Sequence, residues 1–151
     1  GGMLAPAAPA QGGSLIGAKL QPGAASAIPA GFDVAAFERN AKVQFIRLQA
    51  AHDAGNLDDI RSFTTPEMFA EIRMDVSERG AAEQHTEVLQ LDAEVLSVEE
   101  EGLLYVASVR FHGQLREERG GAPSDVDEVW HLTKPRAGSS GWVLAGIQQR
   151  G

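Results

Sequence analysis

The apolar residues of this chain change their spacing at Gly80, and this change limits the possible folds more than any other feature. Before Gly80 they recur every three or four residues, as on one side of an α-helix. After Gly80 they alternate with polar residues, as in strands that bury one face. The sequence therefore predicts helices followed by strands, which is typical of an α+β domain with separate layers.

The first predicted helix covers residues 34–54 and is the longest. Asp33 is placed as its N-cap, and Gly55 as the glycine that ends it. Phe32 and Phe37 flank the start at the spacing of a hydrophobic staple. The helix is therefore expected to bury one apolar stripe and to have well-defined ends.

Two shorter helices are predicted between this helix and Gly80. Asn56 is placed as the N-cap of the first, which carries acidic residues in its opening turn. Thr65 is the N-cap of the second, with Pro66 at the first helical position. This last helix is expected to end at about Arg79, before Gly80.

Four antiparallel strands are expected after Gly80, joined by turns and a polar loop, at residues 88–98, 103–113, 126–134 and 141–149. In the first strand, Leu89 is expected to point inward together with Leu91. Leu96 breaks the alternation, which indicates a bulge or a twist. Val143 and Ile147 are expected on one side of the last strand and Leu144 on the other, so this strand is predicted to be covered on both faces.

Composition excludes several classes of protein. The chain of 151 residues suits a single domain, and it contains no cysteine for a disulfide or a thiolate metal site. Its net charge of −8 argues against nucleic-acid binding, which requires clustered Lys and Arg. No apolar run reaches the length of about 20 residues that spans a bilayer as a helix.

Residues 1–31 are rich in Gly, Ala and Pro and are expected to form a low-complexity linker that is partly disordered. The folded domain is therefore expected to cover residues 32–151. Within the linker, Leu15, Ile16 and Leu20 form a short apolar patch that suits docking on the domain or on a second copy.

The order of three helices and four strands is similar to the NTF2-like (cystatin-like) cone, in which a long first helix lies in the concave face of a curved four-stranded antiparallel sheet. Glu128-Val129-Trp130-His131-Leu132 and Gly141-Trp142-Val143-Leu144-Ala145-Gly146-Ile147-Gln148 resemble the C-terminal signature of the Tim44-like domain family. Further matching residues are Phe37, Phe45, Gly55-Asn56-Leu57, Phe63-Thr64-Thr65-Pro66-Glu67-Met68 and Val109-Arg110-Phe111.

This resemblance implies a non-catalytic domain of a membrane-associated bacterial protein. The domain would bind or transport lipid, or act as a membrane-peripheral scaffold, through an apolar groove between helices and sheet. The expected location is the bacterial inner membrane, with a tether upstream of Gly1 and on a side of the membrane that the sequence does not define. A lipid or a membrane surface is the expected partner, a protein partner is an alternative, and no cofactor is expected.

Apolar residues of the helices and of the central strands are the candidates for lining this groove. They are Phe37, Phe45, Phe63, Met68, Phe69, Ile72, Val109, Phe111, Trp130 and Trp142. The alternative is that they simply fill the core, which would favour a protein-interaction scaffold or a homodimer. Lys134, Arg136 and Arg150 are the only charged residues after Glu128, so they are candidates for contact with an anionic surface.

An enzyme with an NTF2-like pocket is the remaining alternative, with Asp92 as a base and Tyr105 as a hydrogen-bond donor. Asp92 shares the solvent-like side of its strand with Gln90 and Glu94, which disfavours this reading. His112 and His131 are expected on adjacent strands as neighbours. None of the four histidines has metal-ligand spacing, so no metal site is predicted.

Overall fold

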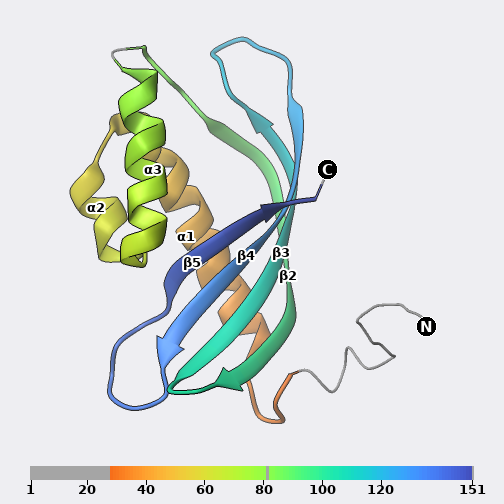
Figure 1. Ribbon diagram of the computed structural model, residues 1–151. Coiled ribbons are helices and arrows are strands. Elements are labelled where there is room, and N and C mark those ends of the chain that lie inside the picture. The colour runs from red at the N-terminus through yellow and green to blue at the C-terminus, as the bar shows by residue number, and fades with distance from the viewer. Residues whose placement is uncertain (1–27, 81, 151) are drawn as a thin grey trace.

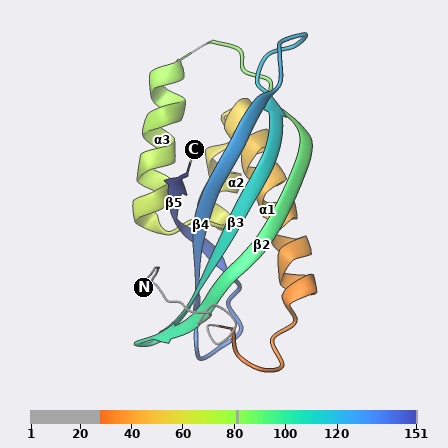
Figure 2. The same ribbon diagram turned by 90° about the vertical axis from the view of Figure 1, so that its right-hand side faces the viewer.

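The computed structural model describes residues 28–80 and 82–150, so Leu15, Ile16, Leu20 and most of the predicted linker lie outside the described residues. The elements in chain order are α1 (Val34–Ala54), α2 (Leu57–Ser62), α3 (Pro66–Arg79), β2 (Glu87–Glu101), β3 (Leu104–Arg116), β4 (Ser124–Pro135) and β5 (Val143–Gln149). The strands form one antiparallel sheet in the order β2-β3-β4-β5. The three helices lie on the concave side of this curved sheet. Figure 2 shows α2 between α1 and α3, and Figure 1 shows α2 farther from the sheet than either. The predicted α+β fold is confirmed and is consistent with the NTF2-like cone.

The ends of α1 are stabilised by the residues that the sequence indicates. A carboxylate oxygen of Asp33 accepts a hydrogen bond from the Ala36 N–H at 3.0 Å. Gly55 adopts the left-handed conformation, with φ of 66°, and its N–H is bonded to the last turn. The rings of Phe32 and Phe37 lie 5.3 Å apart, which confirms the hydrophobic staple.

The two shorter helices also begin as predicted. The Asn56 side chain accepts from the Asp59 N–H at 3.2 Å. The Thr65 hydroxyl accepts from the Met68 N–H at 3.2 Å, with Pro66 at the first helical position. Local capping chemistry is therefore sufficient to define where each helix starts.

An aromatic cluster joins α1 to the two central strands. Phe45 lies on α1, and its ring centroid is 4.9 Å from that of Phe111 on β3 and 5.3 Å from that of Trp130 on β4. The Trp130 indole N–H donates to the Glu128 carboxylate at 2.8 Å, and the Gln149 amide donates to the other oxygen at 3.1 Å. Glu128 is buried, so these two donors satisfy its oxygens inside the protein.

Two bulges interrupt the alternation along β2. Pairing with β3 skips Leu96, which confirms the irregularity predicted there, and it also skips Leu89. The prediction that Leu89 points inward is wrong, because the inserted residue reverses the alternation. Val88 packs against the core together with Leu91, while Leu89 is exposed.

A third bulge changes the faces of β5. Leu132 pairs with Leu144 and His131 pairs with Gly146, so Ala145 is the extra residue. The bulge places Ile147 on the same face as Leu144, and both pack against the core. The prediction that this strand is covered on both faces is therefore wrong. The bulge brings Leu144 and Ile147 to one face although their spacing in the sequence suggests opposite faces. Within β5, Leu144 alone is fully buried.

Both edges of the sheet are bonded to the helical layer. The Glu38 carboxylate on α1 accepts from the Val95 N–H of β2 at 3.0 Å. On the other edge, Leu144 donates to the Phe63 carbonyl at 2.8 Å and accepts from the Thr65 N–H at 2.9 Å. These contacts occupy edge groups that would otherwise be free to pair with another strand.

Gly113 on β3 faces the Leu89 bulge, and a Cβ there would lie 2.0 Å from the Gln90 carbonyl oxygen. We expect Gly113→Ala to lower the free energy of unfolding by about 1–3 kcal/mol, the usual cost of overpacking. Urea denaturation measures this loss. Gly141→Ala is the matched control, because a Cβ at Gly141 meets no atom within 4 Å. Equal midpoints for the two variants would contradict the close approach at the bulge.

Arg110 and Asp127 form a two-bond ion pair on the outer face of the sheet, at 3.0 Å and 2.9 Å. The hydrogen bonds from Arg110 hold the pKa of Asp127 below its ordinary value. The pair therefore stabilises the fold above the unfolded-state pKa, and this contribution is lost as the pH falls through the folded-state pKa.

We expect an NMR titration of the carboxyl carbons to give Asp127 a pKa below the ordinary range, and Arg110→Ala to raise it. Asp59, whose pKa is likewise lowered by hydrogen bonds from Arg47, is the internal control. A pKa of Asp127 that does not change in the variant would show that the ion pair is absent in solution.

Candidate functional site

A hollow of about 410 Å³ lies beside the N-terminal half of α1, next to the start of β5. We call it the Trp142 hollow, and its lining residues are Phe32, Asp33, Phe37, Asn40, Ala41, Gln44, Leu132 and Trp142. It lies near the chain entry, because Phe32 and Asp33 immediately precede α1. A volume of this size is within the range of about 300–1,000 Å³ that is typical of small-molecule sites.

Trp142 forms one wall of the Trp142 hollow and is half-buried. Its ring meets that of Phe37 edge to face, with centroids 5.2 Å apart and planes at 86°. The Gln44 side-chain amide donates to the Trp142 carbonyl at 3.4 Å. The helix and the segment before β5 are thus held together around an apolar surface that remains partly open.

Polar groups accompany this apolar surface. Asp33, which precedes α1, and Asn40 and Gln44 in the N-terminal half of α1 line the same hollow. Phe37, Ala41, Leu132 and Trp142 supply its apolar lining. This combination suits a ligand with an apolar body and one polar group.

The ten residues predicted to line a groove divide into two groups. Phe37 and Trp142 line the Trp142 hollow, and Phe37 is also part of the buried core. The other eight belong to the buried core, and they are Phe45, Phe63, Met68, Phe69, Ile72, Val109, Phe111 and Trp130. Phe45 also borders a second hollow of about 310 Å³, whose lining includes Asp125, Asp127 and Glu128. The structure therefore brings few of the predicted residues together at one open surface.

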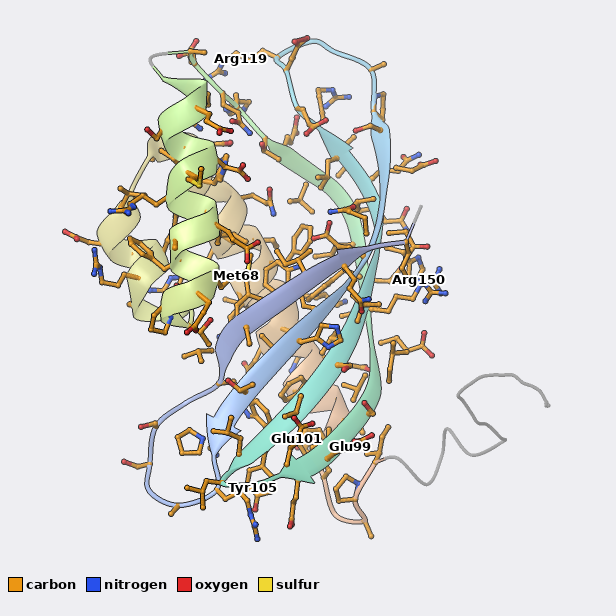
Figure 3. The ribbon with its side chains drawn as sticks, viewed as in Figure 1. Met68, Glu99, Glu101, Tyr105, Arg119 and Arg150 are labelled. Atoms are coloured by element: carbon orange, nitrogen blue, oxygen red, sulfur yellow. The ribbon has the colours of Figure 1, made fainter. Side chains whose placement is uncertain are left out.

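The three predicted cations do not form one patch. Arg150 donates its backbone N–H to the Asp127 carbonyl, and Lys134 lies seven residues further along β4, at about 3.4 Å per residue. Arg136 is held at the β2–β3 turn, where its guanidinium contacts the Gly102 carbonyl at 3.1 Å and Glu100 at 3.2 Å. Figure 3 shows Glu99, Glu101 and Tyr105 at this end of the sheet, well away from Arg150. Of the three cations, Arg136 is thus paired with an acidic residue of β2, Glu100.

The residues considered for catalysis lie apart from one another. Asp92 is exposed and pairs with His112 across the β2–β3 ladder, whereas Tyr105 pairs with Glu100 near the opposite end. The prediction that His112 and His131 are neighbours is wrong, because the register places Asp127 opposite His112 and Ser108 opposite His131. His131 instead contacts the Ser108 hydroxyl at 3.0 Å and the Gln148 amide oxygen at 2.8 Å.

Residues 28–80 and 82–150 contain no group of three or more His, Asp or Glu side chains arranged to hold a metal ion. None of the helices in this part of the chain is long and apolar enough to cross a membrane.

Sequence reasoning missed the polar members of the Trp142 hollow. Asn40 and Gln44 follow Phe37 at three and seven residues, so they flank the apolar stripe of α1. That spacing indicates in the sequence that Phe37, Asn40 and Gln44 are neighbours on the helix surface, because residues three and four apart lie side by side there. It identifies a candidate site only once the tertiary structure places Trp142 opposite these residues.

Comparison with known proteins adds one match. The model of the Tim44-like domain family matches residues 21–149. No curated protein matches the chain significantly. The matched range contains every helix and strand described above, including the buried Glu128 and Trp130 pair and the Trp142 hollow. The chain therefore belongs to the Tim44-like domain family.

Proposed function

We propose that this domain binds the acyl chain of a lipid, or an apolar ligand of similar width, in the Trp142 hollow, without catalysing a reaction. The observation that carries the proposal is the half-buried Trp142, packed edge to face on Phe37 beside a hollow of about 410 Å³. A large aromatic side chain left partly open beside such a space is a suitable wall for an apolar ligand.

The polar lining supports a ligand with two chemically different ends. An acyl chain would contact Phe37, Leu132 and Trp142, and its polar end would meet the amides of Asn40 and Gln44. Asp33 at the same site disfavours a fully anionic headgroup held close to it, because the like charges repel.

A position beside a bacterial inner membrane is part of this proposal and is motivated by family membership. Because Arg150 lies seven residues along β4 from Lys134 and Arg136 is paired with Glu100, attraction by a single basic patch on the closing hairpin gives this position little support. In this proposal the protein meets the membrane through its ligand, or through a tether elsewhere in the full-length protein.

A protein-interaction scaffold is the second candidate function. It is favoured by the eight predicted groove residues that fill the core, since a filled core offers no large lipid cavity. The two functions differ in one measurable property, which is whether the wild-type protein takes up an apolar probe.

The test is titration of a fluorescent fatty acid. Asn40→Trp should block the Trp142 hollow and weaken binding about ten-fold or more, because a bulky side chain would occupy the space of the ligand. The matched control is Ser77→Trp, which places the same side chain at an exposed position of α3 outside the hollow. Circular dichroism shows whether both variants keep the fold.

Each outcome has a distinct meaning. Weaker binding for Asn40→Trp alone supports a ligand site in the hollow. Equal binding for the wild type and both variants would place the probe elsewhere. A wild-type protein that binds no probe at micromolar concentrations would contradict lipid binding and favour the scaffold.

A further inference from the structure

The Trp142 hollow is lined by three aromatic rings that stand at large angles to one another. The ring centroids of Phe32 and Phe37 are 5.3 Å apart with planes at 51°, and those of Phe37 and Trp142 are 5.2 Å apart with planes at 86°. Phe32 and Trp142 are half-buried, so part of each ring remains open to a ligand. Aromatic rings gathered in this way are typical of sites for ammonium groups, because the negative face of a ring attracts a cation.

The charge of the hollow has the same preference. Among the described residues that line it, the one charged side chain is the carboxylate of Asp33. Its Oδ1 atom accepts a hydrogen bond from the Ala36 N–H at 3.0 Å. A carboxylate has about four acceptor positions, so Asp33 keeps acceptor capacity for a cation next to the aromatic rings.

The two amide side chains of the lining add acceptors without adding positive charge. The Nε2 atom of Gln44 donates to the Trp142 carbonyl at 3.4 Å, which leaves its Oε1 atom as an acceptor. Asn40 supplies a second amide oxygen to the same lining. The hollow therefore combines aromatic rings, one carboxylate and amide oxygens, a set that suits a cationic group better than an anionic one.

Charged residues of both signs lie beyond the lining. Figure 3 shows Glu99 and Glu101 at the same end of the sheet as Tyr105, whose ring centroid is 6.5 Å from that of Trp142. Lys134 pairs with Tyr105 across the β3–β4 ladder, but it does not line the hollow. The net charge of −8 favours the approach of a cation over that of an anion. Lys134 is thus the competing charge that an experiment has to separate from Asp33.

From these observations we infer that the ligand of the Trp142 hollow carries an ammonium headgroup, with or without N-methyl groups, on an apolar chain. This inference rests on the proposed ligand-binding function and names the chemical class of that ligand. The ammonium group lies between Phe32, Trp142 and the Asp33 carboxylate, and the chain follows Phe37 and Leu132. Figure 1 shows the start of α1 and the loop before β5 at the same end of the domain, so the two sides of the headgroup site come from these segments.

The test compares amphiphiles that share a decyl chain and differ in their headgroup. Decyltrimethylammonium and decylammonium are the cations, decanoate is the anion, and decyl maltoside is the neutral reference. Isothermal titration calorimetry measures the affinity of the full chain for each, below its critical micelle concentration. We expect both cations to bind about ten-fold more tightly than decanoate, because the Asp33 carboxylate attracts an ammonium group and repels a carboxylate.

Asp33→Asn is the decisive variant. Asparagine keeps a side-chain oxygen that accepts from the Ala36 N–H, so the cap of α1 is retained while the charge is removed. We expect both cations to bind this variant about five- to ten-fold more weakly and decanoate to bind no more weakly than before. The matched control is Asp58→Asn, which removes the same charge from the first turn of α2, outside the hollow. Its affinities should equal those of the wild type.

Phe32→Leu tests the contribution of the aromatic rings. Leucine keeps an apolar neighbour for Phe37 but removes the ring that attracts a cation. We expect the affinity for both cations to fall about two- to five-fold, the range of an exposed cation–π contact, and the affinity for decyl maltoside to stay the same. Melting curves followed by circular dichroism show whether the variant keeps its fold.

The outcomes separate this inference from the proposed function. Equal affinities for all four amphiphiles, lost in Asn40→Trp, would retain the ligand site and overturn the preference for ammonium. The preference is also overturned if Asp33→Asn leaves the ratio of cation to anion affinity unchanged. Tighter binding of decanoate that is weakened by Lys134→Gln would assign an anionic headgroup to the site. Binding of no amphiphile would contradict the ligand function itself.

Discussion

The fold depends most on the contact of Phe45 with Phe111 and Trp130. This contact places α1 across the two central strands, and Ala107, Val109 and Leu132 are buried beside it. The indole N–H of Trp130 has its hydrogen-bond partner in Glu128, which also accepts from Gln149 on β5. One cluster therefore connects α1, β3, β4 and β5, and the removal of any member would leave a cavity or an unsatisfied buried polar group.

This cluster also decides where a ligand can bind. Because its aromatic rings fill the middle of the concave face, the Trp142 hollow lies beside the N-terminal half of α1. Trp142 comes just before β5 begins, so it is not bound by the sheet ladder. The same helix thus supplies core residues on one side, hollow-lining residues next to them and the exposed Val43 and Ile46 opposite.

Most of the residues that form the recognised sequence motifs pack in the core or bond to it. Glu128, Trp130 and Leu132 share the inward face of β4, so the Glu-x-Trp-x-Leu pattern describes one buried hydrogen bond and two core side chains. Most of the predicted groove residues are core for the same reason. Alternation and helical spacing identify the side of an element that faces inward, but they do not distinguish a cavity wall from close packing.

The order of the elements and the starts and ends of the helices were determined by the sequence alone. Asp33, Asn56, Thr65 and Gly55 act on backbone groups within a few residues of themselves, so their effect is local. The tertiary structure decided the bulges at Leu89 and Ala145, the separation of Lys134 from Arg150, and the wall that Trp142 forms opposite Asn40 and Gln44. These features depend on strand register and on which distant segments meet. A shift of one residue in register moves every later side chain to the other face, and no single segment encodes that choice.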